Sequence, residues 1–313
     1  MAVINIDDAY ILNETGEQVD KVTGLFTKNE NTTNPEKAFA QLNIGTAGSN
    51  RNLLDNGWFT VNQRQITTPS SPISGYPSDR WYGTYSAVTS DGVTIPAQNA
   101  VDLYQKLEPD LCAALVGKTV TVSTLEQDGT ILSFTCVFPA YGSGEGGNYN
   151  MGNGIGCFVQ NISGYQRVRF RISDQRTTPF ALRAAKLELG SVSTLANDTP
   201  PNYAEELLKC QRYFTRWYST AGSSAIGLAL AVGTTNANFA LLSNLRAEGS
   251  ATVSFTGLVL SDGTDKTVTN VSVAGAGDGK SMRLLVTSSG LTAYRPYVLQ
   301  ITAGGHLDVS KDL

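Results

Sequence analysis

The sequence is poor in the residues on which much enzyme and metal chemistry depends. It has one histidine, His306, and four cysteines, none in a Cys-x-x-Cys or similar ligand spacing: Cys112, Cys136, Cys157 and Cys210. Zinc sites and serine or cysteine hydrolases nearly always use histidine. We therefore predict no catalytic residues, no metal and no cofactor. The cysteines are interpreted as small buried apolar groups, made in a reducing cytosol.

Charge is also scarce, since Asp, Glu, Lys and Arg make up 16% of the chain and the net charge is −4. A protein that binds nucleic acid needs a basic stripe to neutralise phosphates. The nearest feature is the alternation of Arg167, Arg169 and Arg171, which fits the solvent face of a strand. The sequence therefore predicts no nucleic-acid partner.

Long apolar runs are absent as well. No segment approaches the roughly 20 residues that a membrane span requires. The first ten residues lack the basic and apolar regions of a secretion signal. We therefore expect no membrane insertion, and release from the cell by a route such as lysis.

Short strands separated by turns dominate what is present. Residues 119–125 and 131–138 predict a hairpin around Gln127-Asp128-Gly129, and the second strand alternates apolar and polar residues, so that one face is buried. Similar strands at 166–172, at 182–189 and through the last hundred residues favour an antiparallel architecture. We predict an all-β fold of two antiparallel β-sandwich, jelly-roll-like domains joined by a short helix.

Four parts are predicted along the chain. Residues 1–50 form an extended lead segment with a short helix at 35–42, residues 51–192 the first sandwich, residues 193–216 a linker and helix, and residues 217–313 the second sandwich. Pro200-Pro201 favours a boundary. The linker helix, expected over 203–214, carries an apolar stripe of Leu207, Cys210 and Phe214. We interpret this stripe as a seam near a three-fold axis, because an exposed apolar helix is otherwise a liability; the alternative is a contact within one chain.

Three stretches resemble tail fibre proteins of bacteriophages and prophages. They are NTTNPEKAFAQLNIG at 31–45, NLLDNGWFTVNQ at 52–63 together with DRWY at 79–82, and AKLELGSVSTLANDTPPNYAEELLKCQRYF at 185–214. The second is similar to the opening of a carbohydrate-binding-like jelly roll, although Trp58 stands where that family usually has a polar residue. The third is the most specific, because it joins strand, linker and helix in one order.

The resemblance implies a homotrimer at the distal end of a virion tail, made in the bacterial cytoplasm, that binds a host surface glycan or protein. Residues 1–50 would then attach to other tail or baseplate proteins. A structural tail component that binds only virion proteins is the alternative. A glycan depolymerase is a further one, but its paired carboxylates are candidates by type only: Glu108, Asp110, Glu126 and Asp128.

Candidate ligand-binding residues are aromatic, since flat rings suit the apolar faces of sugars. They are Tyr82 and Tyr85 beside Trp81, and Tyr141, Tyr149 and Asn150 in the glycine-rich stretch 141–156. Trp81 itself is interpreted as a core residue, and the glycine-rich stretch is equally compatible with a loop that has no partner. Asp55, Asn56 and Glu188 do not complete the six to eight oxygens that calcium prefers, so a solvated surface is favoured there.

Overall fold

The computed structural model describes residues 10–12, 18–21, 49–65, 74–84, 87–90, 92–97, 100–140, 145–162, 165–172, 177–242, 244–246, 250–276 and 281–311. Most of them lie in antiparallel strands, so the predicted all-β class is confirmed. Two α-helices, α3 (Pro109–Leu115) and α4 (Tyr203–Gln211), and the 3-10 turn η2 (Leu195–Asn197) complete the described elements. No helix in these ranges is long and apolar enough to cross a membrane.

The chain divides into two compact units. The first comprises Met1–Asn50 with Ala196–Asp198, and the second comprises Arg51–Leu195 with Thr199–Leu313. In the first unit, β1 (Tyr10–Leu12) pairs antiparallel with β2 (Gln18–Lys21). The helix expected at residues 35–42 lies outside the described residues.

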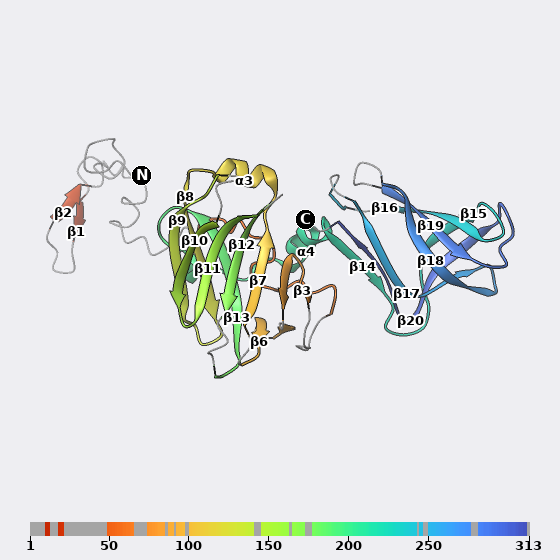
Figure 1. Ribbon diagram of the computed structural model, residues 1–313, viewed down its shortest axis with the longest axis horizontal. Coiled ribbons are helices and arrows are strands. Elements are labelled where there is room, and N and C mark those ends of the chain that lie inside the picture. Colours follow the sequence, from red (N-terminus) through yellow and green to blue (C-terminus); the bar gives the residue numbers. More distant parts are fainter. Residues whose placement is uncertain are drawn as a thin grey trace, which may run out of the picture. The chain divides into compact units, whose positions relative to one another are not determined.

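Two sheets of the second unit enclose one hydrophobic core (Figure 1). The six-stranded sheet has the order β10 (Glu145–Gly152), β11 (Ile155–Ile162), β12 (Tyr165–Ile172), β7 (Val101–Lys106), β4 (Trp81–Thr84) and β3 (Ser74–Ser78). The five-stranded sheet has the order β5 (Ala87–Thr89), β6 (Gly92–Ile95), β13 (Phe180–Leu189), β8 (Thr119–Glu126) and β9 (Ile131–Val137). Each sheet therefore turns one face toward this core.

The clearest sequence patterns agree with this arrangement. The predicted hairpin is β8–β9, in which Leu132, Phe134 and Cys136 pack against the core while Ser133 and Thr135 are exposed. Trp81 is fully buried, and its ring centroid lies 5.2 Å from that of Phe59 and 6.0 Å from that of Phe170. The interpretation of Trp81 as a core residue is confirmed.

One face of β13 differs from expectation. The sequence interpretation favoured a solvated surface at Glu188, but Glu188 and Lys186, which lies two residues earlier on the same face, are both fully buried. The segment after the strand covers them: Thr194 donates its backbone N–H to Glu188 Oε1 at 2.8 Å, and Lys186 Nζ donates to Thr194 Oγ1 at 2.8 Å. The two charges lie 3.6 Å apart, so each offsets the cost of burying the other.

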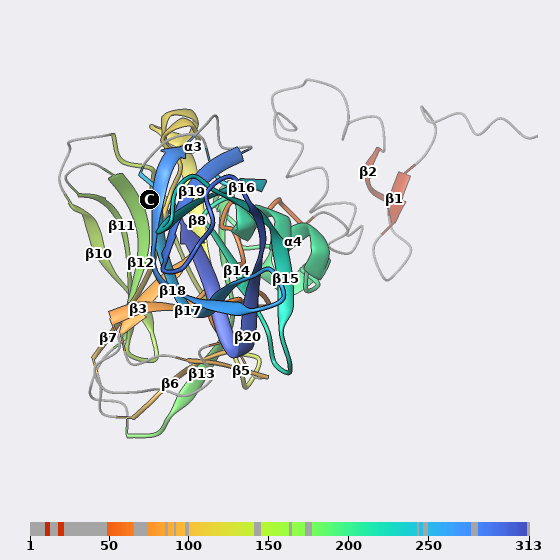
Figure 2. The same cartoon turned by 90° about the vertical axis from the view of Figure 1, so that its right-hand side faces the viewer.

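The remaining strands form one sheet, of order β14 (Phe214–Tyr218), β20 (Pro296–Ser310), β15 (Ser224–Ala231), β16 (Asn236–Leu242), β19 (Ser281–Ser288), β18 (Asp265–Ala276) and β17 (Thr252–Ser261). Because β20 pairs with β15 and also with β17, the sheet closes on itself around a second core (Figure 2). This differs from the pair of facing sheets predicted for residues 217–313. A period of two in a strand predicts that one face of its sheet is buried. Closure of the sheet into a barrel buries that face just as a second, facing sheet does, so the pattern does not distinguish the two arrangements.

The linker helix also ends earlier than predicted. Helix α4 begins after Asn202, whose side chain accepts a hydrogen bond from the backbone N–H of Ala204 at 2.9 Å. It stops at Gln211, and Phe214 already opens β14. Phe214 stands at helical spacing from Leu207 and Cys210, so it looks like part of the same apolar stripe in the sequence although it belongs to the next strand.

Candidate functional site

Two of the stretches that carry the resemblance, 52–63 with 79–82 and 185–214, meet at a largely buried polar cluster. We call this cluster the hub, and it consists of Asp55, Asn56, Arg80, Glu206 and Tyr213 together with Glu108. Asn56 organises one side of it, with a left-handed backbone (φ 51°). Its side-chain amide donates to the carbonyl oxygens of Val61 and Asp79 at 2.8 and 2.9 Å. Its carbonyl accepts from Trp81 Nε1 at 3.0 Å, which ties the hub to the core.

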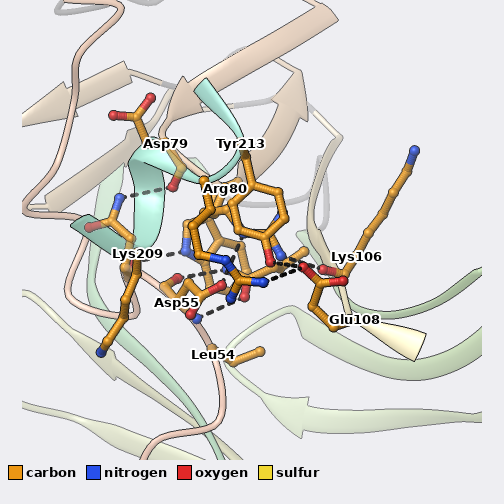
Figure 3. Close-up of polar contacts among 12 residues, drawn as sticks. Leu54, Asp55, Asp79, Arg80, Lys106, Glu108, Lys209 and Tyr213 are labelled. Carbon is orange, nitrogen blue, oxygen red and sulfur yellow. Dashed lines mark hydrogen bonds and ion pairs between the residues drawn. The ribbon is translucent and has the colours of Figure 1, made fainter. Parts of the chain in front are cut away.

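Arg80 lies at the centre of the hub (Figure 3). It occupies the tight turn between β3 and β4 with a φ of 72°, which non-glycine residues adopt uncommonly. Its Nε donates to Asp55 Oδ2 at 3.1 Å, and its Nη2 donates to the carbonyl oxygen of Lys106 at 2.8 Å. The guanidinium stacks 3.5 Å from the ring centroid of Tyr213 and is 4% exposed. Arg80 is therefore held in one orientation.

Helix α4 and the residues after it close the hub. Glu206 accepts a hydrogen bond from the backbone N–H of Asn56, and the hydroxyl of Tyr213 donates to Glu108. Burial raises the pKa of Tyr213 well above its ordinary value, so the phenol keeps its proton for this bond. Residues about 150 positions apart in the sequence are thus joined in one network, and the linker is fixed against the first core.

A cluster of tyrosines lies on the outward face of the six-stranded sheet, next to the hub. Tyr82 and Tyr104 are register partners on β4 and β7, with ring centroids 4.9 Å apart, and Tyr76 on β3 meets Tyr82 edge-on at 5.5 Å. With Arg80 and Lys106 these rings line a shallow depression of the surface. We call Tyr76, Tyr82 and Tyr104 the tyrosine cluster.

Two further cations flank these rings. The guanidinium carbon of Arg64 lies 4.5 Å from the ring centroid of Tyr76, and that of Arg167 lies 4.4 Å from that of Tyr104. Such contacts are attractive because the face of an aromatic ring is electron-rich. The depression therefore combines apolar ring surface and phenol hydroxyls with cationic side chains, of which Arg64 and Arg80 are paired with Asp79 and Asp55.

Of the three predicted ligand-binding residues that the structure describes, Tyr82 belongs to this depression. Tyr149 and Asn150 lie on β10, which is separated from β4 by β11, β12 and β7. Asn150 is exposed and accepts a hydrogen bond from the backbone N–H of Gly152 at 2.9 Å, which is a local turn contact. Tyr82 is therefore not brought together with Tyr149 and Asn150. The other two predicted residues, Tyr85 and Tyr141, lie outside the described residues.

The sequence interpretation missed Tyr76, Arg80, Tyr104 and Lys106. Tyr104 and Lys106 alternate with buried residues in Val101–Lys106, so their outward direction was available from the period of two. Their proximity to Tyr82 depends on the pairing of β4 with β7, which nothing in the local sequence encodes.

The predicted three-fold seam is largely covered within one chain. Cys210 is fully buried and Phe214 is 4% exposed, with the Arg64 guanidinium carbon 3.6 Å from its ring centroid. Leu207 is half-buried. Cys210 and Phe214 therefore offer no surface to a second chain, and the stripe acts as the contact within one chain that the sequence left as the alternative.

Exposed apolar side chains gather instead on the closed sheet. Leu228 and Leu230 on β15, Val232 just after it and Leu242 on β16 are 68, 49, 45 and 82% exposed. Tyr294, 82% exposed, joins them through its backbone N–H, which donates to Ala231 at 2.8 Å. No charged residue occurs between Arg216 and Arg246 in the sequence. We call these five residues the apolar face.

The candidate carboxylates and calcium ligands have structural partners. Glu108 accepts from Tyr213 and Arg246, Glu126 accepts from Asn153, and Asp128 caps its own turn at Thr130, while Asp110 lies in the first turn of α3. Asp55 pairs with Arg80, and Glu188 with Lys186. Asn56 and Glu188 are fully buried, so the solvated surface favoured from the sequence is wrong for these two residues. Within the ranges that the structure covers, no group of three His, Cys, Asp or Glu side chains could hold a metal ion.

The cysteines and the histidine are also accounted for. All four thiols are free, and burial raises the pKa of Cys112 and of Cys136 to about 11 and those of Cys157 and Cys210 further. They remain protonated and weakly nucleophilic near neutral pH. His306 Nδ1 lies 3.1 Å from Thr256 Oγ1 on the closed sheet.

Comparison of the chain with protein-family models, with curated proteins and with solved structures gave no match.

Proposed function

We propose that this chain is the receptor-binding protein of a bacteriophage tail fibre, which attaches the virion to a glycan on the host surface. The observation that carries the proposal is the hub. The stretches 52–63, 79–82 and 185–214 were among those singled out by their resemblance to tail fibres. In the hub Asn56 contacts Glu206, and Arg80 contacts Tyr213. These stretches build one polar cluster together. This supports a common origin of the chain and tail fibre proteins more strongly than similarities scattered over unrelated parts of the fold would.

In this proposal the two sheets over residues 51–192 form a carbohydrate-binding-like jelly roll. Residues 217–313 form the tip, and residues 193–216 the linker that the hub anchors. Residues 1–50 attach to other tail or baseplate proteins. In this proposal the protein recognises the host glycan without catalysing a reaction, and it is located in the virion.

The tyrosine cluster is the proposed contact with the glycan. Its rings are half-buried, so each is fixed by the sheet while part of it remains accessible. Fixed aromatic surface lowers the ordering cost of binding, and phenol hydroxyls supply hydrogen bonds to sugar hydroxyls.

The proposed assembly is a homotrimer, with the apolar face as its contact in place of the stripe on α4. The five side chains expose on the order of 600 Å², if one fully exposed large side chain presents about 200 Å². A standard interface buries about 800 Å² per partner, and monomers rarely leave an apolar patch of several hundred Å² uncovered. The segment between Arg216 and Arg246, which carries four of the five residues, brings no charged side chain to such a contact. Three linked copies raise the avidity of weak sites.

The test is binding of fluorescently labelled full-length protein to a panel of bacterial strains. We expect attachment to at least one strain, loss of attachment after periodate oxidation of the cell-surface sugars, and a marked loss for Tyr82→Ala. Tyr203→Ala, which removes an exposed tyrosine from α4, is the matched control and should bind like the wild type.

Other outcomes would contradict parts of the proposal. Attachment that survives periodate but not protease would indicate a protein receptor. Release of reducing sugar from the envelope would indicate a depolymerase. Attachment to no strain, together with binding to fibreless virions, would indicate a structural tail component.

A further inference from the structure

We propose that the tyrosine cluster selects an acidic glycan, whose carboxylate or phosphate is held by the cations around the rings. This inference rests on the proposed glycan recognition and names the chemical class of its ligand. It starts from a contrast in charge. The chain as a whole is acidic, at −4, while the charged residues that line the depression are Arg80 and Lys106, both cations.

The carboxylates nearest to the depression hold its arginines. Asp79 is 1% exposed, and its Oδ1 accepts from Arg64 Nη1 at 2.9 Å, while its Oδ2 accepts from the backbone N–H of Gln63. Asp55 accepts from Arg80 and is fixed by Gln105, whose amide donates to the Asp55 carbonyl at 2.7 Å. These acids position positive groups next to the rings and are not among the residues that line the depression.

Arg80 is organised before any ligand arrives. Its left-handed φ, its two hydrogen bonds and its stacking against Tyr213 fix the guanidinium at the edge of the depression. Sparsely populated backbone conformations of this kind cluster at ligand clamps. The guanidinium is 4% exposed and paired with Asp55, so Arg80 acts by fixing the edge of the depression, through its bond to the carbonyl oxygen of Lys106.

Lys106 supplies a second kind of cation. Its carbonyl oxygen is held by Arg80, and its side chain extends away from the hub (Figure 3). Tyr104 lies two residues earlier on the same side of β7. An ammonium on a flexible stem suits a carboxylate or phosphate as a point charge, while the rings of Tyr82 and Tyr104 suit the sugar itself.

The test is isothermal titration calorimetry of the full-length protein with a set of defined oligosaccharides. The acidic probes are oligogalacturonate, hyaluronan oligosaccharide, oligosialic acid and glycerol-phosphate oligomer, and the neutral probes are maltoheptaose and chitohexaose. We expect at least one acidic probe to bind more tightly than both neutral probes, with an affinity that falls as salt is raised. A carboxylate-only or phosphate-only result identifies the source of the charge.

Single substitutions distinguish binding at the tyrosine cluster from non-specific electrostatic attraction of an acidic glycan to the protein surface. Lys106→Gln and Tyr82→Ala should each weaken the best acidic probe by about tenfold or more, as expected for loss of a charge-assisted bond or a ring contact. Lys118→Gln, which removes an exposed lysine outside the depression, should leave the affinity unchanged. Circular dichroism should show that all three variants fold.

Three results would overturn the inference: no acidic probe binds, the neutral probes bind as tightly, or Lys106→Gln and Lys118→Gln behave alike. If the labelled protein still attaches to cells through periodate-sensitive sugars, the proposed function stands and only the acidic class fails. If acidic probes bind at the tyrosine cluster but no cells are bound, the proposed function fails instead.

Discussion

At the scale of single residues, side chains of the same type differ widely in their environment inside and outside the hub. Asn56 and Asn150 are both asparagines next to a turn, yet Asn56 is fully buried and Asn150 is exposed. The amide of Asn56 satisfies carbonyl oxygens of two different segments, whereas that of Asn150 serves its own turn. The same residue type therefore contributes very different free energies of folding.

Asn56→Ala is expected to lower the free energy of unfolding by about 3 kcal/mol or more. The substitution removes the acceptor of the buried Val61 N–H and a donor to the buried Asp79 carbonyl oxygen, and each such loss costs roughly 1–3 kcal/mol. It also places alanine at a φ of 51°, which adds strain. Urea denaturation followed by tryptophan fluorescence measures the change.

Asn150→Ala is the control for this experiment, and it should change the free energy of unfolding by no more than about 0.5 kcal/mol, as for an ordinary surface site. Equal effects of the two substitutions would contradict the role assigned to Asn56.

At the scale of elements, the buried pair on β13 depends on the segment that covers it. Lys186 and Glu188 carry opposite charges with no exposure, and Thr194 supplies hydrogen bonds to both. Removing one member leaves an uncompensated buried charge, whereas removing both does not. The pair should therefore be strongly non-additive.

Lys186→Met alone is expected to cost about 3–5 kcal/mol of stability, the range for breaking a buried pair. Lys186→Met with Glu188→Gln should cost much less than the two single substitutions taken together. A double-mutant cycle by urea denaturation gives the coupling free energy. Additive effects would mean that the two charges do not interact in the folded chain.

The elements differ in how well the sequence alone predicts them. The β8–β9 hairpin was predictable because its turn and its alternation are both local signals. The burial of Lys186 and Glu188 was not predictable. The segment around Thr194 that covers them has no periodic pattern, and charged side chains are ordinarily expected to face water. The tyrosine cluster was predictable only at Tyr82, because Tyr76 and Tyr104 reach it through strand pairing between distant segments.

At the scale of the whole molecule, the apolar face predicts self-association. Light scattering of the purified full-length protein should give the mass of about three chains. Leu228→Lys with Leu230→Lys should reduce it to the mass of one chain, because two charges would be buried unpaired at the contact.

Val137→Lys with Val192→Lys is the matched control, since both valines are exposed but lie outside the closed sheet. A wild type with the mass of one chain would contradict self-association and the gain in avidity together. A trimer that persists in the Leu228 and Leu230 variant would move the contact to another surface.

The closed sheet has a consequence for the order of events during synthesis. Strand β20 pairs with β14, β15 and β17, and it follows all three in the sequence. The ring of strands therefore cannot close on the ribosome until β20 has emerged, whereas the core around Trp81 needs only residues that emerge much earlier. Until then β15 and β17 each present an unpaired edge, which is a template for pairing with other chains. The emergence of β20 therefore removes the edges at which two incomplete chains could pair with each other.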